Sequence, residues 1–240
     1  MIVKQCNLGR VMAVVIETDG DETPGRSARK RAAILEAATE MFLRTGFLGT
    51  NMDEIAARSS VSKQTVYKHF GSKEALFIEI VSAMMGATDS LVHTAPPDPK
   101  TREELQRYLL DYGYRQLKVA MTPELMQLRR LVIGEVPRFP DLARVLHERG
   151  PQRAINVLAE AFGRLTEQGL LACDDPVVAA TTFNWLVMAE PVNRVMLLGN
   201  AALPTDVQLQ AVTIEATRVF MASYVRAQLG PRTGYAWRTT

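Results

Sequence analysis

The sequence predicts an all-α protein built from two helical parts. Apolar residues recur every three or four positions along most of the chain, whereas no segment shows the sustained alternation of a β-strand. Proline or glycine separates these periodic segments, which run for roughly 12 to 25 residues. With 240 residues, 47% of them hydrophobic and 22% charged, the composition is that of a folded globular chain.

Four helices are expected in the N-terminal part. The first has an apolar stripe that includes Ile34, Leu35 and Phe42, and Gly46 follows it as a stop signal. Hydroxyl side chains precede the other three and predict their N-caps. The expected helices are Ser27 to Thr45, a short one capped by Thr50, one from Ser62 to Gly71, and one capped by Ser72 that reaches Met85.

A segment with three prolines, residues 94–100, predicts a linker to the C-terminal part. The helices expected beyond it are Thr101–Ala120, Pro123–Val136, Phe139–Arg149, Gln152–Glu167, Asp175–Leu198 and Pro204–Leu229. The predicted organisation is therefore a mobile leader (1–25), an N-terminal domain (26–90), a C-terminal helical bundle (95–230) and a tail (231–240).

Charge is concentrated in the N-terminal domain. The net charge of the chain is only +2, but residues 25–75 hold nine basic side chains against five acidic ones. The rest of the chain beyond residue 75 is balanced. A basic module on a neutral body is typical of a protein that binds a polyanion.

Residues 50–73 carry the pattern of a helix-turn-helix. Two short capped helices are joined by the turn Arg58-Ser59-Ser60-Val61. In the second helix Val66 and Phe70 share one face, which predicts their burial against the preceding helices. The opposite face mixes cationic, amide, hydroxyl and phenolic groups, and such groups suit the major groove of DNA.

The predicted DNA contacts fall into two sets. Side chains on the exposed face of the second helix are expected to read bases: Lys63, Gln64, Thr65, Tyr67, Lys68 and His69. Residues at helix starts are expected to hold phosphates, helped by free backbone N–H groups: Thr50, Asn51, Ser62 and Lys73.

Residues 50–77, and above all 61–76, closely resemble the DNA-binding head of TetR-family transcriptional regulators. Residues 32–38 with Phe42 and Gly46 match the first helix of that head, and Ser60 departs from the glycine that the family often has in the turn. The resemblance implies a homodimer whose two heads bind half-sites of a near-palindromic operator. It also implies a C-terminal domain that binds a small molecule and then moves the heads out of register.

The C-terminal half is similar to the AefR-like, multidrug-efflux-associated branch of the family in residues 139–142 and 183–186. Its last two predicted helices are apolar over much of their circumference, which predicts a four-helix bundle with a second subunit. A thick monomeric core is the alternative.

A pocket for a small apolar effector is predicted from large, adaptable side chains in the C-terminal half. The candidates are Tyr108, Tyr112, Met126, Phe162, Phe183, Trp185 and Met188. The same side chains also fit an ordinary hydrophobic core, and the sequence leaves that alternative open.

The sequence shows no signature of catalysis, no ligand spacing for a metal, and no apolar run long enough to cross a membrane. We therefore expect no enzyme activity, no metal, no cofactor, no membrane partner and a cytoplasmic, nucleoid-associated location. The predicted function is a ligand-responsive repressor. The alternatives are a DNA-bound adaptor without a ligand, of the nucleoid-occlusion type, and a transcriptional activator.

Overall fold

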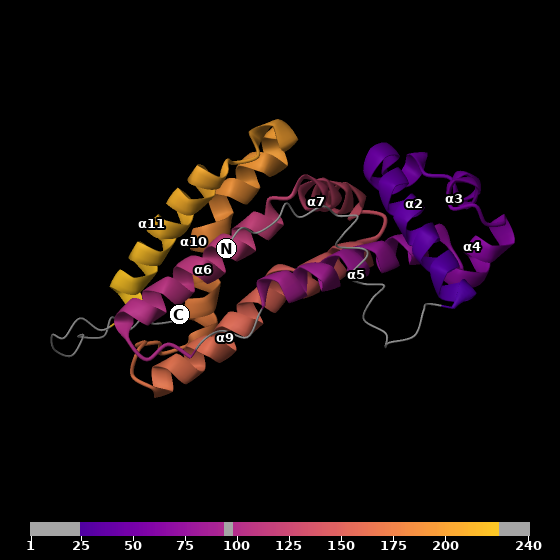
Figure 1. Cartoon of the computed structure of the whole chain (residues 1–240). Helices are drawn as coiled ribbons and strands as arrows, with labels where there is room; N and C mark the ends of the chain where they lie inside the picture. The colour runs from indigo at the N-terminus through magenta and orange to yellow at the C-terminus, as the bar shows by residue number, and fades with distance from the viewer. Residues whose placement is uncertain (1–24, 94–97, 226–240) are drawn as a thin grey trace, which may run out of the picture.

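A computed structural model describes residues 25–93 and 98–225, and all regular elements in these ranges are helices (Figure 1). The all-α prediction is confirmed. The predicted leader lies outside the described residues except for Gly25, as do the tail and linker residues 94–97. The helices are α2 (Arg26–Gly49), α3 (Met52–Arg58), α4 (Lys63–Phe70), α5 (Lys73–Val92), α6 (Arg102–Ala120), α7 (Pro123–Glu135), α8 (Pro140–Arg149), α9 (Pro151–Glu167), α10 (Pro176–Leu198), the short 3₁₀ helix η1 (Asn200–Ala202) and α11 (Asp206–Tyr224).

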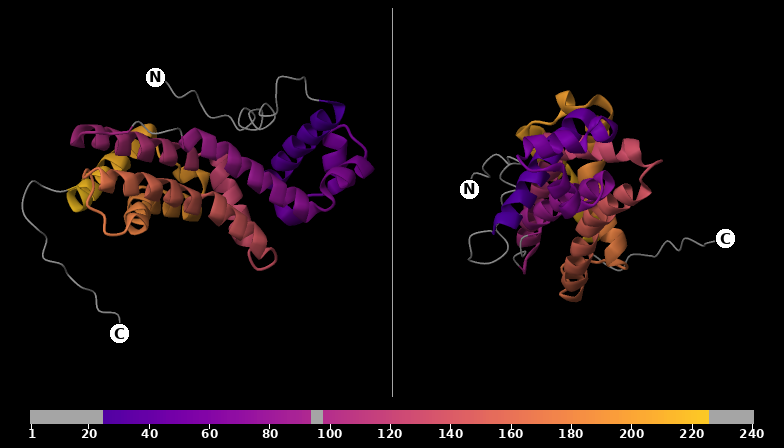
Figure 2. Two further views of the ribbon diagram at one scale, coloured as in Figure 1. Left: turned by 90° about the horizontal axis from the view of Figure 1, so that it is seen from below. Right: turned by 90° about the vertical axis from the view of Figure 1, so that its right-hand side faces the viewer.

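Helices α2, α3 and α4 form a head at one end of an elongated molecule, and α5 runs from this head into a helical body (Figures 1 and 2). Val66 and Phe70 of α4 are buried against the head helices, as predicted. Gly46 has a φ of 75° inside α2 and interrupts its helical backbone, which agrees with the predicted stop.

Three predicted boundaries are wrong. One is the end of the last helix, which is Tyr224 and not Leu229. The N-cap of α3 is Asn51, whose side chain accepts a hydrogen bond from the Asp53 backbone N–H, and not Thr50. Helix α5 continues past Met85 to Val92, because its last turns pack into the core of the body. The caps predicted at Ser62 and Ser72 are confirmed, since each side chain accepts a backbone N–H three residues on.

The hydrophobic cores do not follow the division predicted at residues 90–95. The core of the head also contains side chains of α7 and α8, among them Leu128, Val132 and Leu142. The core of the body is built mainly from α6, α9, α10 and α11 and receives Val92 from the end of α5 and Met126 from α7. Head and body therefore share α5. The head packs directly on α7 through α2, and α8 packs on α5.

The body is held by close pairing of α6 with α11 and of α9 with α10. Gly113 allows the first of these contacts. A methyl group in its place would lie 3.0 Å from Thr213 Cγ2 and 3.3 Å from Val187 Cγ2, so a larger residue would push the helices apart.

Helix α5 contradicts the expectation that no apolar run is long enough to cross a membrane. By length and composition this helix is apolar enough to cross a membrane, although no such run was expected. Half of the apolar stretch is buried inside the protein, against α2, α6 and α8. Its apolar character is explained by its membership of both cores.

The turn between α3 and α4 generates a stability prediction. Ser60 has a φ of 54°, and the Val61 and Ser60 N–H groups donate to the Ala56 and Ala57 carbonyls. This is a Schellman-type helix end, which favours glycine at the position of Ser60.

We expect Ser60→Gly to raise the free energy of unfolding by about 1 kcal/mol, because glycine removes the strain of the left-handed conformation. Ala57→Gly, at an exposed position inside α3, serves as the control and should lower it by about 1 kcal/mol. Urea unfolding followed by circular dichroism measures both. A loss of stability in Ser60→Gly would contradict the assignment of strain.

Candidate nucleic-acid interface and regulatory cavity

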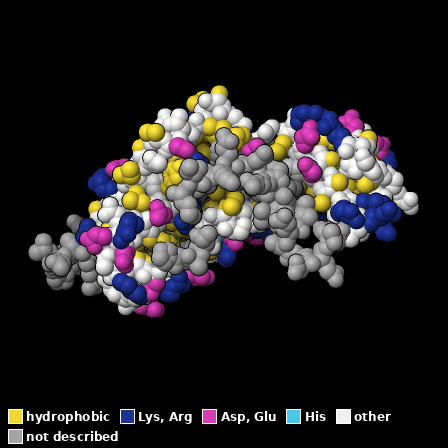
Figure 3. All heavy atoms as spheres, in the orientation of Figure 1, with side chains coloured by type: hydrophobic (Ala, Val, Ile, Leu, Met, Phe, Trp, Pro, Cys, Tyr) yellow, Lys and Arg dark blue, Asp and Glu magenta, His cyan; other side chains and the backbone are white. Residues whose placement is uncertain are grey.

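The exposed face of α4 presents the side chains predicted to read DNA. Gln64, Tyr67 and Lys68 project to solvent, and Tyr67 is 42% exposed. None of these three side chains has a hydrogen bond or ion pair with another described residue. We call the set Lys63, Gln64, Thr65, Tyr67 and Lys68 the reading face. Lys and Arg side chains gather at the end of the molecule that holds α4 (Figure 3).

Two members of the reading face are already engaged. Lys63 Nζ lies 2.8 Å from Asp53 Oδ1, and this contact raises the pKa of the lysine. Thr65 Oγ1 lies 2.8 Å from Ser62 Oγ. Both contacts are exposed to solvent, so little free energy is lost when contacts with DNA replace them. His69 is half-buried beside Phe70 and lies at the margin of the face.

The residues predicted to hold phosphates differ in their exposure in the structure. Asn51 and Ser62 are exposed caps at the starts of α3 and α4. Thr50 is 3% exposed, and its hydroxyl donates to the Gly46 carbonyl at 2.7 Å. The Thr50 side chain is therefore enclosed by the end of α2, and the role predicted for Thr50 in holding a phosphate stays a prediction.

Lys73 has an internal role that sequence reasoning missed. Its ammonium donates to the carbonyls of Phe47 and Thr50, at 2.9 and 3.0 Å, and lies 4.5 Å from the centre of the Phe47 ring. It thus fastens the start of α5 to the corner between α2 and α3. The phosphate contact predicted for Lys73 stays a prediction, since an ammonium has a third donor.

The head is also fastened to α7 and α8. Phe47 packs against Phe139, the residue before α8, with ring centres 4.6 Å apart. The side-chain amide of Gln127 in α7 donates to the carbonyl of Leu43. These contacts connect the orientation of the head to the positions of α7 and α8.

A partly open cavity of about 80 Å³ lies where the two cores meet. Some lining residues, Met85, Leu125 and Leu146, belong to the core of the head. Others, Val92 and Met188, belong to the core of the body. A molecule in this cavity therefore touches both cores.

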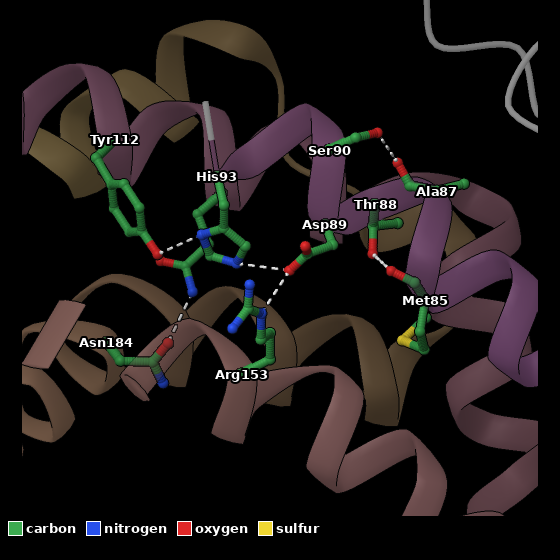
Figure 4. A network of polar contacts seen from close by, with 10 residues as sticks. Met85, Ala87, Thr88, Asp89, Ser90, His93, Tyr112, Arg153 and Asn184 are labelled. Carbon is green, nitrogen blue, oxygen red and sulfur yellow. Dashed lines mark hydrogen bonds and ion pairs between the residues drawn. The ribbon is translucent and has the colours of Figure 1, made fainter. Parts of the chain in front are cut away.

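Polar groups converge on the same cavity. His93 Nδ1 lies 3.2 Å from the Tyr112 hydroxyl, and Asp89 accepts from Arg153 Nε at 3.0 Å and faces the other ring nitrogen of His93 (Figure 4). Burial lowers the pKa of His93, and it raises the pKa of Tyr112. This network ties the end of α5 to α6 and α9.

Across the cavity, Asn184 of α10 accepts a hydrogen bond of 2.7 Å from the side-chain amide of Gln116 in α6. Gln116 is 6% exposed and Asn184 is 1% exposed. Gln116 Oε1 and Asn184 Nδ2 are buried without a partner among the described residues. One acceptor and one donor are therefore left for a bound molecule.

Comparisons with known proteins agree on one family. The family described as "Bacterial regulatory proteins, tetR family" matches residues 34–80, and "AefR-like transcriptional repressor, C-terminal domain" matches residues 107–226. The chain is 30% identical to the HTH-type transcriptional repressor SCO4008 of Streptomyces coelicolor, over 79% of this chain and 94% of that protein. The chain belongs to the TetR family of transcriptional regulators.

Solved structures of TetR-family proteins show the same architecture. A putative TetR-family transcriptional regulator from Mesorhizobium loti superposes with a TM-score of 0.75 and 33% identity, covering 85% of this chain and all of that one. The flavonoid-responsive regulator FrrA gives a TM-score of 0.68 and 32% identity, covering 82% of this chain and 97% of that one. Members of the family are DNA-binding regulators and not enzymes.

The cavity of this TetR-family regulator contains few of the side chains predicted for it. Trp185 and Met188 line it. The other five candidates are buried in the core of the body and are not among its lining residues: Tyr108, Tyr112, Met126, Phe162 and Phe183. Their helices turn these five side chains into the packing between α6, α9, α10 and α11, and their role in a pocket stays a prediction.

Sequence reasoning missed most of the true lining, including His93, Gln116 and Arg129. Asn184 and Arg130 are both polar residues on helices near the cavity, but of these two only Asn184 lines it. Arg130 instead donates to the Val195 carbonyl and to Asn200. No local pattern in the sequence separates the two.

Lys73→Met tests the internal role of the lysine in this regulator. We expect a loss of about 2 kcal/mol in the free energy of unfolding, because two backbone carbonyls lose their charged donor. Lys68→Met is the matched control and should change the value by less than about 0.5 kcal/mol, since Lys68 is exposed. Urea unfolding at one fixed protein concentration compares them, and equal losses would contradict the role.

His93 predicts a pH dependence of stability. Its pKa is lowered in the folded protein, so below pH 6.5 the unfolded chain takes up a proton that the folded protein does not. Stability is therefore lost as the pH falls through this range. Between pH 7.5 and 5.5 we expect the Tm of the wild type to fall more than that of His93→Gln.

The control for this measurement is His147→Gln, which changes an exposed histidine and should follow the wild type. Differential scanning fluorimetry at each pH gives the three curves. If Tm changed with pH by the same amount in the wild type and in His93→Gln, His93 would take up its proton equally well in the folded protein and in the unfolded chain.

Proposed function

We propose that this protein is a transcriptional repressor that leaves its operator when a small molecule occupies the cavity between the two cores. The observation that supports this most directly is the course of α5. It begins at Lys73, which is bonded to the corner of the head, and its last two turns line the cavity with Met85, Thr88 and Asp89. A helix of 20 residues spans about 30 Å, and it is stiff enough to transmit a displacement.

The cavity is also connected to the head through α7 and α8. Leu125 of α7 and Leu146 of α8 line it, and α7 packs against α2 whereas α8 packs against α5. A ligand that pushes α5 away from α7 and α8 therefore changes the orientation of the head. For release from DNA it must bind this displaced state better, and a preference of about 100-fold corresponds to about 2.7 kcal/mol.

Operator binding in our proposal uses two copies of the head. Large apolar side chains are exposed on α10 and α11, among them Val178, Leu186, Val207 and Ile214. Exposure of this kind is typical of a protein-protein interface, and pairing of these helices across a two-fold axis would make a four-helix bundle. Two reading faces then address major grooves about 34 Å apart on near-palindromic DNA.

The alternatives receive less support. A DNA-bound adaptor without a ligand is expected to have a sealed core, whereas this core has an open cavity with unpaired polar atoms. Repression is favoured over activation because SCO4008 and the matched C-terminal family are named as repressors. We place the protein in the cytoplasm on the nucleoid, as this function requires.

Tyr67→Ala tests the DNA-binding part of the proposal. The operator is first obtained by selection from randomised duplexes, and affinity is then measured by fluorescence anisotropy on operator and scrambled DNA over a salt series. We expect operator affinity to fall by about 1 to 3 kcal/mol, with a smaller change on scrambled DNA, because Tyr67 is expected to contact bases.

Leu91→Ala is the control, since Leu91 is as exposed as Tyr67 but lies at the far end of α5. It should bind the operator like the wild type. If Tyr67→Ala lost the same affinity for operator and for scrambled DNA, Tyr67 would have no role in base recognition. Failure of the wild type to select any sequence would overturn the proposed function.

A further inference from the structure

The cavity contains a cationic group that nothing in the described structure neutralises. Arg129 of α7 lines the cavity and is partly buried, yet its side chain has no hydrogen bond or ion pair with a described residue. Burial lowers the pKa of its guanidinium, and no described acid offsets that effect. Holding an unpaired guanidinium partly out of water costs free energy, and a bound anion would offset that cost.

The charges of the other lining residues also favour an anionic ligand. Its lining includes a second guanidinium, Arg149, which also has no partner among the described residues. The acidic residue in the lining is Asp89, whose carboxylate is already paired with Arg153 and faces His93. The lining therefore has an excess of positive charge that an anionic ligand would balance.

The uncharged part of the lining indicates the rest of the ligand. Gln116 Oε1 and Asn184 Nδ2 offer one acceptor and one donor, which together fit a hydroxyl group. Trp185 lines the cavity while 43% exposed, so it lies where the cavity meets solvent and offers an aromatic surface. The volume of about 80 Å³ is about half that of cavities of roughly 150 Å³ that hold benzene, so the enclosed part of the ligand is small.

We propose that the effector of this regulator is a small organic carboxylate rather than a neutral apolar molecule. Its carboxylate pairs with Arg129, a hydroxyl group binds the Gln116–Asn184 pair, and an aromatic or apolar body contacts Trp185 and Met188 at the opening. Arginine is suited to this because its planar fork donates two parallel hydrogen bonds to a carboxylate. This inference rests on the proposed function, since it names the ligand class of the same cavity.

The sequence provides a fluorescent reporter for a direct test. It contains two tryptophans, Trp185 and Trp237, so Trp237→Phe leaves the one at the cavity as the single tryptophan. In this full-length background, 4-hydroxybenzoate and benzoate are titrated up to 10 mM, with 4-hydroxybenzyl alcohol as the neutral counterpart. The measurement needs no DNA.

We expect both carboxylates to change the emission of Trp185, with 4-hydroxybenzoate binding at least tenfold more tightly than the neutral alcohol. Arg129→Gln should abolish this preference. Arg138→Gln removes the same charge from an exposed position that does not line the cavity, and it should keep the preference. The double variant Gln116→Met/Asn184→Leu should bind benzoate and 4-hydroxybenzoate equally.

Thermal unfolding separates these effects from misfolding. Arg129→Gln should unfold at a Tm equal to or above that of the wild type, because it removes an unpaired buried charge. If Arg129→Gln lost the preference for the carboxylate and also had a lower Tm than the wild type, the result would count against a direct role of Arg129. Restoration of the preference by Arg129→Lys would then count for that role.

Equal binding of 4-hydroxybenzoate and the alcohol, an unchanged preference in Arg129→Gln, or no binding of any carboxylate would overturn the inference. Each of these results leaves the proposed function standing if the protein still selects an operator and a neutral compound releases it. Loss of operator selection with carboxylate binding intact would overturn the proposed function instead.

Discussion

The arrangement of this TetR-family regulator depends on α5 being buried in two hydrophobic cores at once. Phe77, Ile80 and Met84 belong to the core of the head, and Val92 belongs to the core of the body. Packed cores resist small displacements, because each side chain is held by many close contacts. A shift of α5 that suits one core must therefore be accommodated by the other, and this constraint links the cavity to the DNA-binding surface.

The two ends of α5 are held by different kinds of interaction. At the head, the ammonium of Lys73 bonds directly to backbone carbonyls of Phe47 and Thr50, which makes a stiff connection. At the body, Asp89 and His93 take part in a network with Arg153 and Tyr112 beside the cavity. A ligand that enters there competes with or adds to polar contacts in a setting of low dielectric, where such contacts are strong.

The polar lining of the cavity is stabilising only when it is filled by matching groups. The unpaired atoms of Gln116 and Asn184, and the unneutralised guanidinium of Arg129, lower the stability of the folded protein. Functional sites commonly retain such costs, because the same groups provide affinity and selectivity once a ligand is bound. The exposed contacts of the reading face, such as Lys63 with Asp53, are weak by comparison and are readily exchanged.

The sequence by itself determined the features that depend on neighbours along the chain. The helical class, the caps at Ser62 and Ser72, the burial of Val66 and the composition of the reading face all follow from spacing within a few turns of helix. Only the tertiary structure decided which side chains line the cavity, why Thr50 is enclosed, and where Lys73 directs its ammonium. These depend on contacts between distant helices, and a helical stripe of aromatic residues such as Phe162 and Phe183 looks the same in a core as in a pocket until the partner helices are placed.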